Sequence, residues 1–254
     1  MFDPRAPTLK RNLVEGHPLG VFWFSLGSVA LIEAAVAAGA EAIVIDMQHG
    51  LFDRTTLEAA IGAVPAGVPC LVRVEDDTAT AIGRALDAGA EGIIVPLVET
   101  GEQARKAAAA CHYAPKGHRS GGGVRPLRDF RAYMGAASQA ITVGVMIETK
   151  AGVDNAEAIA AAGHVDFIFI GTGDLALSVA TAPGGDAHSA ACAEILEACR
   201  RAGKPCGTFT FGAEAAAGKI AEGYAVTVVA NDISAMNGAF ADAAAAFRVL
   251  RSGP

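Results

Sequence analysis

Eight short apolar segments, each of strand length, recur along the chain and are separated by alanine-rich segments. Continuous apolar runs of this length are typical of parallel strands that are covered on both faces. Several of the alanine-rich segments are followed by a glycine, at Gly39, Gly89, Gly163, Gly203 and Gly223, where a helix would end. The expected strands are residues 20–26, 42–46, 69–74, 92–96, 141–147, 166–170, 205–210 and 225–230.

The segments between these runs have the length and composition of helices, for example 55–64, 78–88, 101–111, 153–162, 187–202 and 233–250. Eight strand–helix units in 254 residues predict an α/β protein with a (β/α)8 (TIM) barrel. An open doubly wound sheet is the alternative, but it needs fewer strands and usually a GxGxxG loop after the first strand, which this chain lacks. We expect a single domain, residues 1–254, without a linker.

The composition and charge of the chain argue against nucleic acid and membranes as binding partners. The chain is 52% hydrophobic and has a net charge of −7 without a basic block, so it lacks the clustered Lys and Arg that bind nucleic acid. No apolar run reaches the length of a membrane span. The first residues, MFDPRAPTLKRNL, lack the apolar core of a signal peptide, and the five cysteines form no CxxC pair. We therefore predict a cytoplasmic protein with reduced thiols that binds neither nucleic acid nor membrane.

Charged residues stand where several predicted strands end. Asp46 ends the second strand, His49 follows three residues later, and Arg73 lies near the end of the third. Glu148 follows the fifth strand, and Asp174 lies just past the sixth. In barrels of this class, catalytic residues come from the C-terminal ends of different strands. Because four strands bring charged side chains to one end, we predict that this end is the active site.

Glu148 and Asp174 together indicate a site for a hard metal ion. Two carboxylates plus waters suit Mg²⁺ or Mn²⁺ and leave positions for substrate oxygens, and Co²⁺ or Zn²⁺ are further candidates. Gly171 and Gly173 support this interpretation because they let backbone N–H groups approach an anion at a helix start. The alternative is that both carboxylates only cap helices, Asp174 the segment DLALS and Glu148 a helix that begins near Gly152.

Arg73 and His49 are the candidates for binding a substrate oxygen and for acid/base catalysis. The planar guanidinium of Arg73 matches a carboxylate or an enolate oxygen, although an ion pair with Glu75 or with a carboxylate on a neighbouring strand fits equally well. His49 could be a general base oriented by Asp46, or a loop residue without a chemical role. A Schiff-base mechanism would need a desolvated lysine, and Lys150 is the only lysine near a C-terminal strand end.

Other residues that often carry chemistry are assigned to structural roles. Trp23 and Met146 are interpreted as packing residues. The sequence has no GxSxG motif and no cysteine beside a candidate base, so a Ser or Cys nucleophile is not expected. Four histidines fall at helix ends or in loops, where we expect them on the solvated surface: His17, His112, His164 and His188.

A long segment, residues 114–139, separates the fourth and fifth predicted strands and contains GHRSGGGVRPLRDF. It is too long for an ordinary connection, so we expect a functional role or subunit contacts. Its four arginines, Arg119, Arg125, Arg128 and Arg131, form the one cluster that could hold the phosphates of coenzyme A. A solvated basic face or a subunit contact is the simpler interpretation of that cluster.

Taken together, these segments resemble one family over residues 20–248, and the matching pieces are AGAEAIVIDMQHG, PCLVRV, LDAGAEGIIVPLVET, YAPKGHRS, VMIETKAGVDN, VDFIFIGTGDLALS and the strand in RAGKPCG. The chain resembles the HpcH/HpaI family of divalent-metal-dependent (class II) pyruvate aldolases, in particular the hydroxy-keto-acid aldolase subgroup. The resemblance implies a (β/α)8 barrel of the phosphoenolpyruvate/pyruvate type. It also implies a homohexamer, a trimer of dimers that exchange the C-terminal helix at about residues 233–250.

The resemblance also implies roles for the metal and the substrate. Glu148 and Asp174 would bind the metal, and pyruvate would chelate it through its carboxylate and keto oxygens. Arg73 would hold the keto oxygen and stabilise the enolate. The backbone N–H groups of Gly173 and Asp174 would receive the substrate carboxylate.

The resemblance also implies which residues transfer the proton and which stabilise the site of a neighbouring subunit. His49, oriented by Asp46, would act as the acid/base through a metal-bound water. Asp87 would support the histidine of a neighbouring subunit, and Arg119 is a second candidate for support.

The implied reaction is the reversible cleavage of a 4-hydroxy-2-oxo acid to pyruvate, or a related 2-oxo acid, and an aldehyde. The chain departs from many family members around this site: Gln48 replaces Glu in DGEH, Met146 replaces Gln, Ser120 replaces Gly, and GTGD replaces GP-x-D. These departures bear on which aldehyde is accepted rather than on the reaction class. Two alternatives stay open, an acyl-CoA ester lyase of the same superfamily and a barrel that has lost catalysis.

Overall fold

Eight parallel strands close into a barrel in chain order, each hydrogen-bonded to the next and β8 to β1. The structure is a computed structural model that describes residue 3 and residues 8–252; part of the N-terminal segment used in the signal-peptide argument lies outside these residues. The predicted (β/α)8 barrel is confirmed. The strands are β1 Leu19–Phe24, β2 Ala42–Asp46, β3 Cys70–Arg73, β4 Gly92–Val95, β5 Thr142–Ile147, β6 Phe167–Ile170, β7 Cys206–Thr208 and β8 Val226–Asn231.

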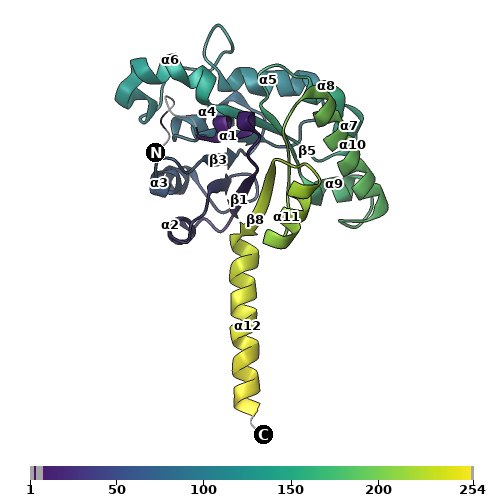
Figure 1. Cartoon of the computed structure of the whole chain (residues 1–254). Coiled ribbons are helices and arrows are strands. Elements are labelled where there is room, and N and C mark those ends of the chain that lie inside the picture. Colours follow the sequence, from purple (N-terminus) through teal and green to yellow (C-terminus); the bar gives the residue numbers. More distant parts are fainter. Residues whose placement is uncertain (1–2, 4–7, 253–254) are drawn as a thin grey trace.

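Helices surround the barrel (Figure 1). Several begin at a side-chain cap of the kind that helix starts favour, such as Asp53, whose carboxylate accepts from the Thr56 N–H at 2.7 Å. None of the described helices has both the length and the apolar character needed to cross a membrane. The helices are α1 Thr8–Glu15, α2 Val29–Ala37, α3 Arg54–Ala63, α4 Ala79–Asp87, α5 Gly101–Cys111, the 3-10 helix η1 Pro126–Asp129, α6 Phe130–Ala140, α7 Lys150–Asp154, α8 Ala156–Ala160, α9 Thr172–Ser178, α10 Asp186–Ala202, α11 Ala213–Ala221 and α12 Asp232–Ser252.

Side chains alternate between the inside of the barrel and the layer under the helices, because successive residues of a strand point to opposite faces. Ile43, Ile45 and Val72 belong to the core between strands and helices. Val44 and Leu71 belong to the cluster inside the barrel. Residues 46 and 73 each lie two positions further along the same strands, so their side chains point inward, at the C-terminal mouth.

The long segment between β4 and β5 is not a loop throughout. It contains η1 and α6, and the carboxylate of Asp129 accepts from the Ala132 N–H at 3.4 Å at the start of α6. This helix is not expected from the sequence, because GGG and the pair Arg-Pro shortly before it are strong turn signals. Tyr133, Ala137 and Ala140 pack α6 against the rest of the protein.

The last helix, α12, extends away from the barrel (Figure 1, yellow). Its first residue is anchored, because the Asp232 carboxylate accepts from the backbone N–H groups of Ser25 and Leu26 at 3.0 and 2.8 Å. Most of its 21 residues have no packing partner within the chain, and its large apolar side chains are exposed. These side chains are Ile233, Phe240, Phe247, Val249 and Leu250.

Candidate active site

Asp46 and Arg73 form a buried ion pair across the neighbouring strands β2 and β3, where they are register partners. Arg73 donates from Nε to Oδ1 at 2.9 Å and from Nη2 to Oδ2 at 2.6 Å. Only 2% of the Asp46 side chain and 12% of the Arg73 side chain are exposed. Two parallel charge-assisted hydrogen bonds hold the guanidinium in one orientation. The partner of Arg73 is thus the carboxylate on the neighbouring strand, not Glu75.

His49 is tied to Asp46 through its backbone. The His49 N–H donates to Asp46 Oδ1 at 3.3 Å, and the Ser25 hydroxyl donates to Oδ2 at 3.2 Å. Burial raises the pKa of the Asp46 carboxyl, but the hydrogen bonds and charge of Arg73 outweigh it, so the pKa is lowered overall. Asp46 is therefore an anion whose strongest contacts go to Arg73. The His49 side chain is exposed at the mouth, and its orientation by Asp46 stays a prediction.

Trp23, interpreted above as a packing residue, also contacts this ion pair. Its indole Nε1 donates to Asp46 Oδ2 at 3.4 Å. The guanidinium carbon of Arg73 lies 5.1 Å from the centre of the indole ring, a distance at which a cation is attracted to the ring face. The signal in the sequence is weak: a tryptophan on an inward strand position needs a partner for its N–H.

Glu148 and Asp174 lie together next to this pair. Glu148 is 2% exposed, and its Oε1 accepts from the backbone N–H of Leu97 at 2.8 Å. Burial raises the pKa of Glu148 to about 7; the Leu97 amide opposes the rise, and the neighbouring Asp174 carboxyl, within hydrogen-bonding reach, adds to it. Arg73 lies near enough to lower that pKa slightly. The residues predicted from four strands therefore meet at one end of the barrel.

The helix-cap alternative for these two carboxylates is wrong. The cap of α7 is Thr149, whose Oγ1 accepts from the Gly152 N–H at 3.1 Å. The residue before α9 is Gly171, and Asp174 lies inside the first turn of that helix. Neither carboxylate is needed to start a helix.

Gly171 lets the chain cross directly over the Glu148 carboxylate. A Cβ at this position would lie 2.3 Å from Glu148 Oε2 and 2.9 Å from Met146 Sδ. Glycine is therefore required by a close approach of backbone to carboxylate. The approach holds the start of α9, and with it Asp174, against Glu148.

The two carboxylates fit a hard divalent cation. Across the described part of the chain, no group of three or more His, Cys, Asp or Glu side chains is arranged for a metal. Mg²⁺ is commonly bound by one or two carboxylates and keeps several waters, so two acidic ligands are sufficient. Burial and the neighbouring Asp174 raise the pKa of Glu148, although Arg73 acts to lower it, so the negative charge of the pair is incompletely balanced. A bound dication would balance it.

Asp87 and Arg119 form a separate ion pair. Arg119 Nη2 donates to Asp87 Oδ1 at 2.9 Å, and Nη1 donates to the Tyr133 hydroxyl at 3.2 Å. Asp87 ends α4 just before β4 begins, at the face opposite the C-terminal strand ends. Within one chain, the structure does not bring these two residues to the mouth.

The contacts give little support to a coenzyme A phosphate site or to a Schiff-base lysine. Arg125 donates to the backbone carbonyls of Ala88 and Glu58, and Arg119 is buried. Two of the four arginines proposed for coenzyme A phosphates thus have structural contacts. Lys150 is exposed and pairs with Asp154, so it lacks the desolvated setting of a Schiff-base lysine.

Two of the four histidines assigned to the surface are buried, so that assignment was wrong for them. His112 is 2% exposed, and burial lowers its pKa to about 4. His188 is 7% exposed and hydrogen-bonded through both ring nitrogens. His188 bonds backbone groups of two neighbouring segments. The ring nitrogens of His112, which follows α5, have no hydrogen-bond partner among the described residues. His17 and His164 are exposed, as expected.

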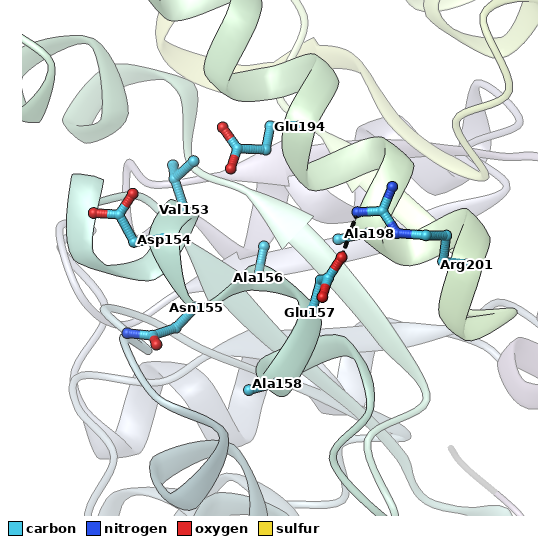
Figure 2. Close-up of a pocket in the computed structure, with 9 residues that line it drawn as sticks. All are labelled: Val153, Asp154, Asn155, Ala156, Glu157, Ala158, Glu194, Ala198 and Arg201. Carbon is cyan, nitrogen blue, oxygen red and sulfur yellow. Dashed lines mark ion pairs between the residues drawn. The ribbon is translucent and has the colours of Figure 1, made fainter.

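A cavity of about 520 Å³ opens between α7, α8 and α10, lined by Asp154, Glu157, Glu194 and Arg201 among others (Figure 2). Arg201 pairs with Glu157 across it at 2.7 Å. None of the predicted site residues lines this cavity, so it is separate from the mouth.

The fold and the site define a (β/α)8-barrel enzyme with an acidic pair and a buried Asp–Arg pair at the C-terminal mouth. The sequence profile described as HpcH/HpaI aldolase/citrate lyase matches residues 20–238. The chain belongs to this family. The predicted family is confirmed, and with it the prediction of an enzyme from a family of lyases.

Three similar proteins illustrate the relationship. A hydroxypyruvate/pyruvate aldolase of Rhizorhabdus wittichii is 35% identical over 242 residues, which cover 93% of this chain and 96% of that protein. A 4-hydroxy-2-oxovalerate aldolase of Rhodococcus jostii is 36% identical over 210 residues, 80% of this chain and 81% of that protein. The crystal structure of a family member from Burkholderia cenocepacia superposes with a TM-score of 0.90 at 32% identity, covering 96% of this chain and all of that one.

Proposed function

We propose that the protein reversibly cleaves 4-hydroxy-2-oxo acids to pyruvate, or a related 2-oxo acid, and an aldehyde, with a divalent metal ion. The observation that carries the proposal is the meeting of Glu148 and Asp174 beside the Asp46–Arg73 pair at the barrel mouth. Similarity to aldolases of hydroxy-keto acids supports it.

Glu148 and Asp174 would hold the metal, with Mg²⁺ or Mn²⁺ as the first candidates and Co²⁺ or Zn²⁺ as others. When bound there, the ion would supply Lewis-acid stabilisation of the negative charge that develops on the 2-oxo acid. The Leu97 N–H already holds one oxygen of Glu148, which orients the carboxylate. Backbone N–H groups of Gly173 and Asp174 would receive the substrate carboxylate.

Arg73 would bind the keto oxygen and stabilise the enolate. Its Nε and Nη2 are occupied by Asp46, so the Nη1 group keeps its N–H bonds for a substrate oxygen. Because Asp46 and Trp23 fix the guanidinium before substrate arrives, little reorganisation is needed as charge develops on that oxygen. Arg73 therefore acts from a preorganised position.

His49 would exchange the proton of the C4 hydroxyl. Its position three residues after Asp46 places it at the mouth, and its exposed side chain can reach a substrate entering from solvent. Carbon–carbon cleavage leaves the electron pair on the 2-oxo acid as the hydroxyl proton passes to the imidazole. In the reverse direction the imidazolium returns that proton to the new alkoxide.

Assembly is part of the proposal. The apolar side chains exposed on α12 suit exchange of this helix between subunits of a homohexamer, a trimer of dimers. In such an assembly Asp87 of one chain would support His49 of a neighbour, with Arg119 fixing Asp87 through their ion pair. The cytoplasmic location and the lack of nucleic acid or membrane partners stay predictions.

The test is pyruvate release from racemic 4-hydroxy-2-oxo acids of several chain lengths, followed with lactate dehydrogenase. The metal-stripped protein should be inactive, and Mg²⁺ or Mn²⁺ should restore it. Glu148→Gln should abolish release, whereas Glu194→Gln, in the cavity of Figure 2, should leave it unchanged.

Three results would contradict the proposal. Activity that survives metal removal and is trapped by borohydride would assign the chemistry to a lysine. Cleavage of an acyl-CoA ester but of no hydroxy-keto acid would favour the ester lyase. No turnover of either substrate class would favour a barrel that has lost catalysis.

A further inference from the structure

His188 lies in the first turn of α10 and has no contact with the mouth, yet both nitrogens of its ring are engaged. The Gly184 N–H, in the loop before α10, lies 3.2 Å from Nδ1. The carbonyl oxygen of Thr172, the first residue of α9, lies 3.1 Å from Nε2. The Sγ of Cys192 packs beside the ring at 3.7 Å from Nε2. The imidazole thus joins the starts of two helices that follow β6.

The two backbone partners fix the tautomer. A backbone N–H can only donate, so Nδ1 must accept and carries no proton. A carbonyl oxygen can only accept, so Nε2 must carry the proton. His188 is therefore the neutral Nε2–H form, with one acceptor used on Gly184 and one donor used on Thr172.

The segment that His188 holds also carries one carboxylate of the acidic pair. Gly171 crosses over Glu148 Oε2, and its N–H donates to the Ile147 carbonyl at the end of β5 at 3.1 Å. Thr172 comes next, and Asp174 follows two residues later. The inner side of this turn therefore rests on β5 and Glu148, and its outer side is held by the His188 ring.

We infer that His188 is a positioning residue that fixes the first turn of α9 so that Asp174 stays beside Glu148 at the proposed metal site. The inference rests on the proposed function, because the metal is what the two carboxylates would share. His188 touches neither metal nor substrate. It acts through the Thr172 carbonyl, in the way that outer hydrogen bonds orient the ligands of metal sites.

Two substitutions separate the donor from the acceptor of His188. The amide of Asn reaches about as far as Nδ1, so His188→Asn keeps an acceptor for Gly184 and loses the donor to Thr172. The amide of Gln reaches about as far as Nε2, so His188→Gln keeps a donor for Thr172. Ser189→Ala is the matched control, because it removes the bond from Oγ to the Gly184 carbonyl at 3.3 Å in the same helix turn.

The experiment measures Mn²⁺ binding to the metal-stripped full-length protein, with free Mn²⁺ followed by electron paramagnetic resonance. His188→Asn should weaken Mn²⁺ binding by about tenfold or more, and His188→Gln and Ser189→Ala by less than about twofold. For pyruvate release, His188→Asn should need more Mn²⁺ for half-maximal rate, while kcat at saturating Mn²⁺ recovers to within about threefold. Melting temperatures are recorded for every variant.

Failure of the inference about His188 can be distinguished from failure of the proposed metal site. The inference is overturned if His188→Asn binds Mn²⁺ like the wild type, even with a lowered melting temperature, because the ring would then be only structural. It is also overturned if His188→Gln or Ser189→Ala loses as much affinity as His188→Asn. Wild-type protein that binds no Mn²⁺, or binds it equally well with Glu148→Gln, would overturn the proposed metal site and this inference with it.

Discussion

Replacing Asp46 by asparagine should destabilise the protein strongly, because it breaks a buried ion pair without removing volume. The carboxylate accepts two hydrogen bonds from Arg73, one each from the Ser25 and Trp23 side chains, and two from the backbone N–H groups of residues 48 and 49. The amide has only one oxygen, so its NH2 group must face at least one of these donors. Arg73 would then remain 12% exposed without its counter-charge.

Removing one partner of a buried pair typically costs about 3–5 kcal/mol. For a chain of this size, about 1 kcal/mol corresponds to about 2 °C, so Asp46→Asn should lower the melting temperature by about 6–10 °C at pH 7. The double variant with Arg73→Gln should be less destabilised than the sum of the single variants, by about 1–3 kcal/mol. Thermal and urea unfolding followed by circular dichroism measure both quantities.

The pH dependence of the same pair has a defined sign. The pKa of Asp46 is lower in the folded state than its usual value, so its contribution is complete above the unfolded-state pKa of about 3.9 and is lost as pH falls through the folded-state pKa. The difference between wild type and Asp46→Asn should therefore be constant near neutral pH and shrink below about pH 4. A melting temperature lowered by less than about 2 °C, or single-variant effects that simply add, would refute this account of the pair.

Two further predictions concern the metal-free site and the assembly. In EDTA-treated protein the folded-state pKa of Glu148, about 7, lies above its usual value of 4.5. The stability that Glu148 contributes below pH 4.5 is therefore lost as pH rises through 7, by about 3 kcal/mol. Glu148→Gln should thus melt higher than wild type at pH 8 but not at pH 4.5, and equal differences at both pH values would contradict this. Replacing Phe240 and Phe247 by serine should reduce the assembly size measured by light scattering, with Asp242→Ser as the control; a monomeric wild type would exclude helix exchange.

The eight apolar runs, alternating with helical segments, were enough to predict the barrel and the end at which charged residues gather. Strand periodicity also places Asp46 and Arg73 on the same face of neighbouring strands. Each residue lies two positions after an inward apolar residue, Val44 or Leu71, on strands that neighbour each other in the barrel. The pairing was left open because the two residues are 27 positions apart, and register between strands cannot be read from either strand alone.

Other features depend on contacts that leave no local pattern. α6 follows a glycine-rich stretch whose turn signals hide the helix. Trp23 looks like any core aromatic until the indole N–H is placed beside Asp46. His188 looks like a polar helix-start residue, and its burial depends on the Thr172 carbonyl, 16 residues earlier in the chain. For Trp23 and His188, a long-range contact that the local sequence does not contain decides the role.

At the mouth of the barrel, the pKa values of two buried carboxylates are shifted in opposite directions. Both Asp46 and Glu148 are almost inaccessible to solvent, so desolvation alone would raise both pKa values. Asp46 receives two charged hydrogen bonds from Arg73, and its pKa lies below the usual value. Glu148 receives one backbone N–H and faces a second acid, Asp174, so its pKa rises to about 7. One carboxylate is therefore an anion near neutral pH that orients Arg73, whereas the charge of the other stays unbalanced until a cation binds.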